Sequence, residues 1–576
     1  MSNRKSSRRL RFGAFLTAGA LLTGGTAAFN MQTASAVPSQ PVIINLGDSF
    51  SSGEGSGWKG NSTDSSGNRD GTDMAASLVN GKWVYDPHSV YDDSSNGYPQ
   101  FDSWEDECHD SRTAPIRRLS NAIPGEYIAL FNWACSGAKT KNIYPITSGG
   151  EIFKGRVPQI THIKNYPLTA QQDVKMVVIG AGGNDAGFGA IIDECVTAWA
   201  KRNIADILYP YKDGTCKDEV RDKFVYNVKD VTYNLNKTIK NLKETLEDQG
   251  QAWGSYKVVV TGAPMILPSD ESDWSYGEDN MGGRCFINRD DAAWINEHFV
   301  TRLNKAMRAT ADEYGVGFLD TSEAFVGHRL CEAGTVRGSA AAASSSNAEW
   351  VRFIDVHLSA SSLWEAVKKT GFPFFEWPLR EGVSEAAMNS QRHISESLHP
   401  NYYGQQAIGK CLSLYYASYI NLPDASHAKC FNSAGENGTT EQMGVSTMTP
   451  TPVYADNPSP DLAIPQTGQA LVRTVTVPNS ATPKQFARVF VNVGHPRKGQ
   501  LSMKLIDPTG YMMNIKDCKE SDQTPAVPGT STFDVPIPAS STTPPRDPSG
   551  NWDLRITECN NDAYAGTLKD WKLTLY

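Results

Sequence analysis

Short apolar runs alternate with helical patterns through most of the 576-residue chain, and this alternation constrains the fold more than any other feature. Between the runs, apolar residues recur at helical spacing from Val228 to Leu246 and from Trp294 to Ala311. Strand–helix alternation predicts an α/β domain over residues 37–432, with a doubly wound parallel sheet. The runs that are typical of buried strands lie at residues 42–46, 174–179, 256–260 and 316–319.

The texture of the sequence changes after residue 432. Residues 433–454 are rich in Gly, Ser, Thr and Pro and show no amphipathic period, which predicts a linker. Beyond it, short strand-like runs are separated by Pro, Gly and Asn, and no long helical pattern occurs. Residues 455–576 are therefore predicted to form an all-β sandwich domain.

The N-terminal segment has the order of a secretory signal peptide. Residues 1–36 hold five basic residues and no acid, followed by an apolar stretch and then Ala34-Ser35-Ala36. A membrane anchor is the alternative, but Gly and Thr dilute the stretch and it falls short of about 20 residues. No later window is apolar enough to span a bilayer. We expect a secreted, extracellular chain that begins at Val37 and has no transmembrane segment.

The net charge limits the classes of binding partner, and the cysteine content indicates disulfides. Without residues 1–36 the chain carries 49 basic and 63 acidic residues, a net charge of −14. Nucleic-acid binding is disfavoured, as are anionic polymers and bare phospholipid surfaces. Ten cysteines in an oxidising compartment indicate disulfides. Pairing between sequential neighbours is one option among 105 for the eight cysteines of the first domain. These neighbours are Cys108 and Cys135, Cys195 and Cys216, Cys285 and Cys331, Cys411 and Cys430, and Cys518 and Cys559.

No metal or cofactor is expected. Zinc would need a tight C-x2-C pair, which the sequence lacks. Asn68-Arg69-Asp70-Gly71 resembles part of a calcium loop, but position 77 is Ser where the closing glutamate would stand. Calcium binding there stays open as an alternative. The surrounding segment, residues 55–97, is long, polar and rich in Gly and Ser, which favours a solvated insertion.

Four polar motifs carry the candidate chemistry, and two of them directly follow apolar runs typical of strands. Ser49 follows the first strand, and a serine at such a turn has the exposed hydroxyl and the nearby N–H that a nucleophile needs. Cys135-Ser136-Gly137 can bring a backbone N–H to a substrate oxygen, and Asn184 offers a side-chain amide after another strand. Glu396-Ser397-Leu398-His399 supplies a histidine that can act as a general base. His109 follows Cys108 and has no partner that the sequence indicates.

In that order, the four motifs resemble the GDSL/SGNH hydrolase superfamily over residues 40 to about 430, in particular its secreted actinobacterial esterases and lipases. The resemblance implies a flavodoxin-like fold, Ser49 as the nucleophile and His399 as the base. It also implies an oxyanion hole formed by Ser49, Gly137 and Asn184. The family usually has Asp three residues before the histidine, where this chain has Glu396. Glu396 is either the third member of a catalytic triad or a bystander, with a backbone carbonyl orienting the imidazole instead.

The C-terminal segment resembles the P/Homo B domain of subtilisin-like proprotein convertases, through motifs such as His495-Pro496-Arg497 and Gly566-Thr567-Leu568. This resemblance implies a jelly-roll sandwich. The catalytic motifs of those proteases are absent from the sequence, so peptidase activity is not expected. We expect a monomeric serine esterase or lipase acting on small-molecule or lipid carboxylic esters. A carbohydrate O-acetylesterase and a non-catalytic extracellular binding protein are the alternatives.

Overall fold

The structure is a computed structural model that describes part of the chain. The expected signal peptide, residues 1–36, and the calcium-loop motif, residues 68–71, lie outside the described residues. The described residues are 39–59, 74, 76–80, 82–85, 87–91, 107–122, 127–165, 167–169, 171–204, 215–275, 285–335, 344–354, 396–420, 426–466, 468–479, 484, 486–519, 521–526, 531–537, 548–560 and 564–576.

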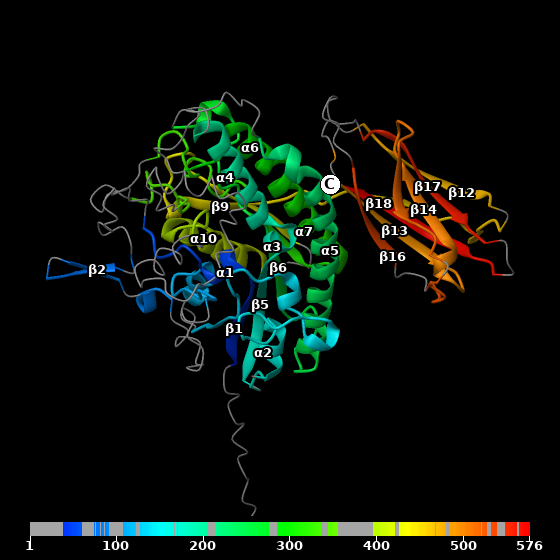
Figure 1. Cartoon of the computed structure of the whole chain (residues 1–576). Helices are drawn as coiled ribbons and strands as arrows, with labels where there is room; N and C mark the ends of the chain where they lie inside the picture. The colour runs from blue at the N-terminus through cyan, green and yellow to red at the C-terminus, as the bar shows by residue number, and fades with distance from the viewer. Residues whose placement is uncertain are drawn as a thin grey trace, which may run out of the picture. The chain divides into compact units, whose positions relative to one another are not determined.

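The first domain is built on a seven-stranded sheet with the strand order β4-β1-β5-β6-β7-β8-β9 (Figure 1). All neighbouring pairs are parallel except β8 and β9. The predicted parallel sheet is confirmed, and it forms because each central strand is apolar on both faces. The strands are β1 (Gln40–Gly47), β4 (Ala129–Asn132), β5 (Gln172–Gly180), β6 (Lys257–Thr261), β7 (Gly317–Asp320), β8 (His427–Asn432) and β9 (Met443–Thr447).

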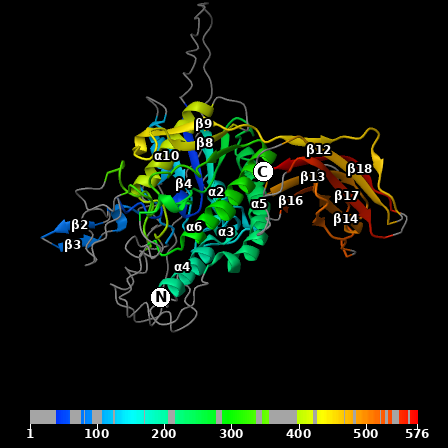
Figure 2. The same cartoon turned by 90° about the horizontal axis from the view of Figure 1, so that it is seen from above.

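Helices lie on both sides of this sheet. Figure 2 shows α10 on one side and α5 on the other. The helix predicted around residues 228–246 is α5, and it buries Val231, Leu235 and Ile239. The second predicted helix runs through α6, a π-helical stretch η9 and α7, and it ends at Gly315 in the left-handed conformation. The bounds are α1 (Ser49–Ser52), α2 (Gln159–Asn165), α3 (Gly183–Ala186), α4 (Phe188–Ile204), α5 (Lys217–Glu247), α6 (Arg289–Trp294), η9 (Ile295–Val300), α7 (Thr301–Tyr314) and α10 (Tyr402–Tyr419).

Two polar segments are more ordered than the sequence suggests. The expected linker at residues 433–454 contains β9, which covers the edge of β8 and buries Met443. An edge strand would otherwise leave its backbone N–H and C=O groups unpaired. The expected solvated insertion at residues 55–97 contains the hairpin of β2 (Ala76–Val79) and β3 (Lys82–Tyr85). The same segment buries Trp58 and Tyr91, which are 5% and 0% exposed.

The C-terminal domain consists of two antiparallel sheets. One has the order β10-β18-β13-β16 with β11 beside β18, and the other has the order β12-β17-β14-β15. Both sheets contribute to one apolar core that includes Trp552 and Trp571. The all-β prediction is confirmed at this level, and the jelly-roll connectivity stays a prediction. The strands are β10 (Val453–Asp456), β11 (Leu462–Ala463), β12 (Ala470–Val477), β13 (Phe486–Gly494), β14 (Leu501–Ile506), β15 (Met512–Lys516), β16 (Ser531–Pro536), β17 (Gly550–Glu558) and β18 (Thr567–Leu575).

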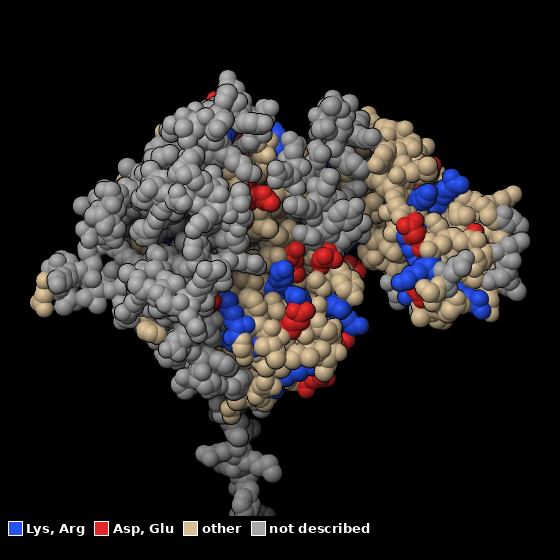
Figure 3. All heavy atoms as spheres, viewed as in Figure 1, with Lys and Arg blue, Asp and Glu red and all other residues tan. Residues whose placement is uncertain are grey.

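Disulfides and surface charge complete the description. The structure pairs all ten cysteines as the five sequential neighbours. In the view of Figure 3, basic and acidic side chains are interspersed over the described surface. Among the described residues, no helix has the length and apolar character that a membrane crossing requires.

Candidate active site

Ser49 lies at the carboxyl end of β1, between β4 and β5. Crevices at the carboxyl ends of parallel strands are the usual binding sites of open α/β sheets. Asp48 caps α1 by accepting a hydrogen bond from Phe50 N at 3.1 Å. Gly47 is required by space, since a Cβ there would lie 2.3 Å from the carbonyl oxygen of Gly180. Ser49 is therefore placed directly after the strand, in the first turn of a short, capped helix.

His399 meets Ser49 from a tight turn that precedes α10. Its Nε2 lies 2.7 Å from Ser49 Oγ, and its Nδ1 lies 3.0 Å from the carbonyl oxygen of Ser397. A carbonyl oxygen only accepts, so Nδ1 carries the proton and Nε2 accepts from the serine hydroxyl. Leu398 has a φ of 63°, a left-handed conformation that costs a non-glycine residue about 1–3 kcal/mol. Hydrogen bonds between the backbones of Arg352 and of Leu398 and His399 hold this turn.

Glu396 does not contact His399 through its side chain. Its two carboxylate oxygens accept hydrogen bonds from Trp58 Nε1 and Tyr91 Oη, each at 2.6 Å. Of the two roles left open for Glu396, the geometry favours the bystander, because the carbonyl of Ser397 is the group that lies next to Nδ1. The physical reason is that Trp58 and Tyr91, from the segment expected to be solvated, draw the carboxylate into the interior.

The three expected oxyanion donors surround the same crevice. Gly137 follows the Cys108–Cys135 disulfide and has a φ of 80°, which glycine adopts without strain. Asn184 is in α3, and its Nδ2 donates to the carbonyl of Ala138 at 3.1 Å, which ties the second and third motifs together. Among the described residues, neither Ser49 N nor Gly137 N donates a hydrogen bond. Ser49, Gly137, Asn184 and His399 all line one cavity.

Burial controls the electrostatics of this crevice. Burial lowers the pKa of His399, against the raising effects of Glu54, the Ser397 carbonyl and Glu396. The imidazole is therefore held neutral, as a general base must be. Burial also raises the pKa of Asp48 to about 7, although the Phe50 N–H opposes the shift. The hydrogen bond from Phe50 N gives Asp48 the structural role of capping α1.

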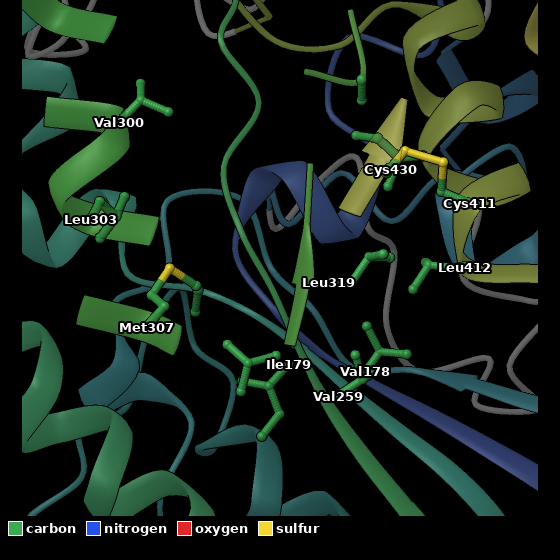
Figure 4. Close-up of a cluster of buried hydrophobic side chains, with 14 of the residues drawn as sticks. Val178, Ile179, Val259, Val300, Leu303, Met307, Leu319, Cys411, Leu412 and Cys430 are labelled. Carbon is green, nitrogen blue, oxygen red and sulfur yellow. A yellow bond between two sulfur atoms is a disulfide. The ribbon is translucent and has the colours of Figure 1, made fainter. Parts of the chain in front are cut away.

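The cavity beside Ser49 has a volume of about 420 Å³. One end is polar, with the four motif residues, and the remainder is mainly apolar. Figure 4 shows Val300, Leu303 and Met307 along the η9–α7 helix, in one cluster with Val178 and Leu412. All five of these residues line the cavity, and so do the aromatic rings of Phe50, Phe188 and Phe299. This arrangement can hold an apolar group next to a nucleophilic serine.

No sequence pattern indicates the buried pair that Glu54 and His109 form near the site. Glu54 Oε2 lies 2.6 Å from His109 Nδ1, and the two side chains are 0% and 3% exposed. The available signals were a glutamate five residues after Ser49 and a histidine directly after Cys108. Neither signal predicts the pair, because the two residues are 55 positions apart and only the fold brings them together.

Comparisons with known proteins find two family matches along the chain. Residues 101–361 match the GDSL-like Lipase/Acylhydrolase family, and residues 485–575 match the Proprotein convertase P-domain. Ser49 and His399 lie outside the first match. Among curated proteins, the transglutaminase-activating metalloprotease of Streptomyces mobaraensis is 29% identical over 147 residues, which is 25% of this chain. The chain spans only 18% of the length of that relative.

Two solved structures are similar to the chain at low identity. The extracellular lipase of Streptomyces rimosus is 18% identical, with 66% of this chain and 100% of that chain covered and a TM-score of 0.35. Phospholipase A1 of Streptomyces albidoflavus NA297 has the same identity and coverage, with a TM-score of 0.31. Values this low assign no substrate. At the level of domains, the chain therefore has a GDSL-like lipase/acylhydrolase domain followed by a proprotein convertase P-domain.

Proposed function

We propose that the chain hydrolyses carboxylic esters of lipids or other small acyl compounds through a Ser49–His399 dyad. The single observation that carries this proposal is the 2.7 Å contact between His399 Nε2 and Ser49 Oγ at the polar end of the cavity. The carbonyl of Ser397 takes the orienting position on Nδ1, so Glu396 is not needed as a third catalytic group.

The chemistry proceeds in two halves. Ser49 Oγ attacks the ester carbonyl carbon while His399 Nε2 takes the hydroxyl proton. The oxyanion that forms accepts hydrogen bonds from Ser49 N, Gly137 N and Asn184 Nδ2. His399 then gives its proton to the leaving alkoxide, and the acyl group stays on Ser49. A water molecule, deprotonated by the same imidazole, attacks the acyl-enzyme. The bond from the acyl carbon to Ser49 Oγ then breaks, the imidazolium returns its proton to Oγ, and the carboxylic acid leaves.

The cavity favours acyl chains longer than acetyl. An acetyl group has one methyl carbon to bury, whereas this cavity is lined by several apolar side chains, among them Phe188, Leu303 and Met307. Each buried methylene contributes about 0.8 kcal/mol to binding. A lipid or medium-chain ester therefore gains more from this site than an acetylated sugar does. Carbohydrate O-acetylesterase activity remains the alternative to test.

The test is a substrate panel with matched serine variants. The wild-type chain should hydrolyse p-nitrophenyl esters, with medium chains preferred to acetate, and should act poorly on acetylated xylan. Ser49→Ala should abolish turnover and labelling by a fluorophosphonate while leaving the folded spectrum unchanged. Ser255→Ala, at an exposed serine, should behave as the wild type. Activity retained in Ser49→Ala would overturn the proposal, and a wild type without labelling would favour a non-catalytic binding protein.

We also propose a secreted, monomeric protein, with a signal peptide cleaved before Val37 and two folded domains at residues 37–432 and 455–576. The five disulfides support an oxidising compartment. Sequencing the N-terminus of the exported chain tests the cleavage site, and any other first residue would contradict it.

A further inference from the structure

Glu54 and His109 form a buried hydrogen-bonded pair that the hydrolysis proposed above does not use. Glu54 has no exposed surface, and His109 is 2% exposed. A carboxylate that is buried without a partner is costly to ionise. Burial would raise the pKa of Glu54, but the charge and the hydrogen bond of His109 hold that pKa below its ordinary value. Glu54 therefore keeps a negative charge inside the domain.

The backbone connects Glu54 to both candidate catalytic residues. Glu54 N donates to the carbonyl of Ser49 at 3.0 Å. The next residue, Gly55, passes so close to the histidine that a Cβ there would lie 3.1 Å from His399 Cβ. The side-chain amide of Gln405 donates both to the carbonyl of Glu54 and to the carbonyl of the residue after His399, at 3.0 and 3.2 Å. The backbone at Glu54 and Gly55 thus lies in direct contact with both residues of the dyad.

Among the described residues, charged or titratable side chains approach the His399 turn from several elements. Glu396 lies on the turn itself, Glu54 follows α1, and His109 comes from the segment after the Cys108 disulfide. The guanidinium of Arg352 stacks on the rings of Trp58 and Phe353, with 3.6 and 3.4 Å to the ring centroids. Among these groups, Glu54 has the largest raising effect on the pKa of His399 and Glu396 has a smaller one, while His109 has a still smaller lowering effect.

We infer that Glu54 is a positioning residue: its carboxylate, held by His109, stabilises the imidazole of His399 while that ring carries the proton taken from Ser49. The inference rests on the proposed Ser49–His399 dyad. Two tasks of a triad carboxylate are divided in this chain. The carbonyl of Ser397 orients the ring, and Glu54 supplies the negative charge from behind the site.

The test removes this charge with little change in shape. Glu54→Gln keeps an oxygen that accepts from His109 Nδ1 and loses the negative charge. The pH profile of kcat/KM for a p-nitrophenyl ester, and the pH profile of fluorophosphonate labelling, are measured on the full chain. The acid limb should move to lower pH by about one pH unit. The plateau should fall by up to about tenfold, because the protonated imidazole is less stabilised.

Controls separate a positioning role from a structural one. Glu151→Gln, at an exposed acid paired with Lys141, should leave both profiles unchanged. If Glu54→Gln fails to fold, the double variant Glu54→Gln/His109→Gln leaves no buried charge in the pair. Its acid limb should move in the same direction by a smaller amount, because the opposing effect of His109 on the pKa of His399 is removed as well. An unmoved acid limb in either folded variant would overturn the inference, even if the melting temperature falls. A wild type that is neither active nor labelled would instead reject the dyad itself.

Discussion

Glu396→Ala removes a carboxylate that the structure places on Trp58 and Tyr91 rather than on the catalytic histidine. Both donors lie in the interior, where Trp58 is 5% and Tyr91 is 0% exposed. Leaving a buried donor unsatisfied costs about 1–3 kcal/mol. With two donors affected, the free energy of unfolding of the first domain should fall by roughly 2–6 kcal/mol.

Turnover should respond much less than stability. His399 keeps both of its contacts in this variant, to Ser49 Oγ and to the carbonyl of Ser397. We therefore expect kcat per active site to fall by less than about tenfold, whereas loss of the orienting acid from a true triad costs about 10⁴. The remaining effect is electrostatic. In the wild type the charge of Glu396 raises the pKa of His399, and the variant loses this contribution.

The assay needs stability and activity from the same preparation. Urea unfolding gives the free energy, and turnover of a p-nitrophenyl ester is divided by the number of sites that a fluorophosphonate labels. Glu396→Gln serves as the matched control, because its one amide oxygen accepts from one of the two donors and should halve the loss of stability. A fall in kcat of about 10³ or more with unchanged stability would refute the reasoning and restore Glu396 as a catalytic group.

Two further predictions concern the same crevice. Asn184→Ala should lower kcat by about 10²–10³, because an oxyanion donor is lost, and steady-state kinetics that show less than a tenfold fall would exclude Asn184 from the oxyanion hole. In the wild type, the acid limb of kcat/KM should lie below pH 6.5, the ordinary histidine value, because burial lowers the pKa of His399 and the neutral ring is the active form; an acid limb above 6.5 in the pH profile would contradict this sign.

The parts of the fold that were predictable are those in which local sequence determines structure. A strand that is buried on both faces is apolar along most of its length. The apolar runs at residues 174–179 and 256–260 therefore predict β5 and β6 without reference to the rest of the chain. The positions of Ser49 and His399 were likewise expected, and the structure brings them within hydrogen-bond distance.

The parts that were not predictable depend on partners far away in the sequence. β9 is a short, half-buried strand with Gly and Ser, and it is held by pairing with β8 and by contacts with α10, such as that between Tyr419 and Thr447. Trp58 and Tyr91 lie in a polar segment whose composition favours exposure to solvent. They are nevertheless buried, and both donate hydrogen bonds to Glu396, more than 300 residues later in the chain. No local sequence pattern predicts these contacts, because the partner of each residue lies far away along the chain.

The separation of tasks around His399 explains why an acid three residues before the histidine can serve another purpose. A carbonyl dipole on Nδ1 is enough to fix the tautomer and the ring orientation, since it only needs to accept one hydrogen bond. It supplies less charge than a carboxylate, so a ring that must carry a proton gains from a nearby anion. Glu54 supplies that charge from a position where His109 keeps it ionised. Glu396 is then available to bind Trp58 and Tyr91, which fastens the segment after α1 against the turn that carries His399.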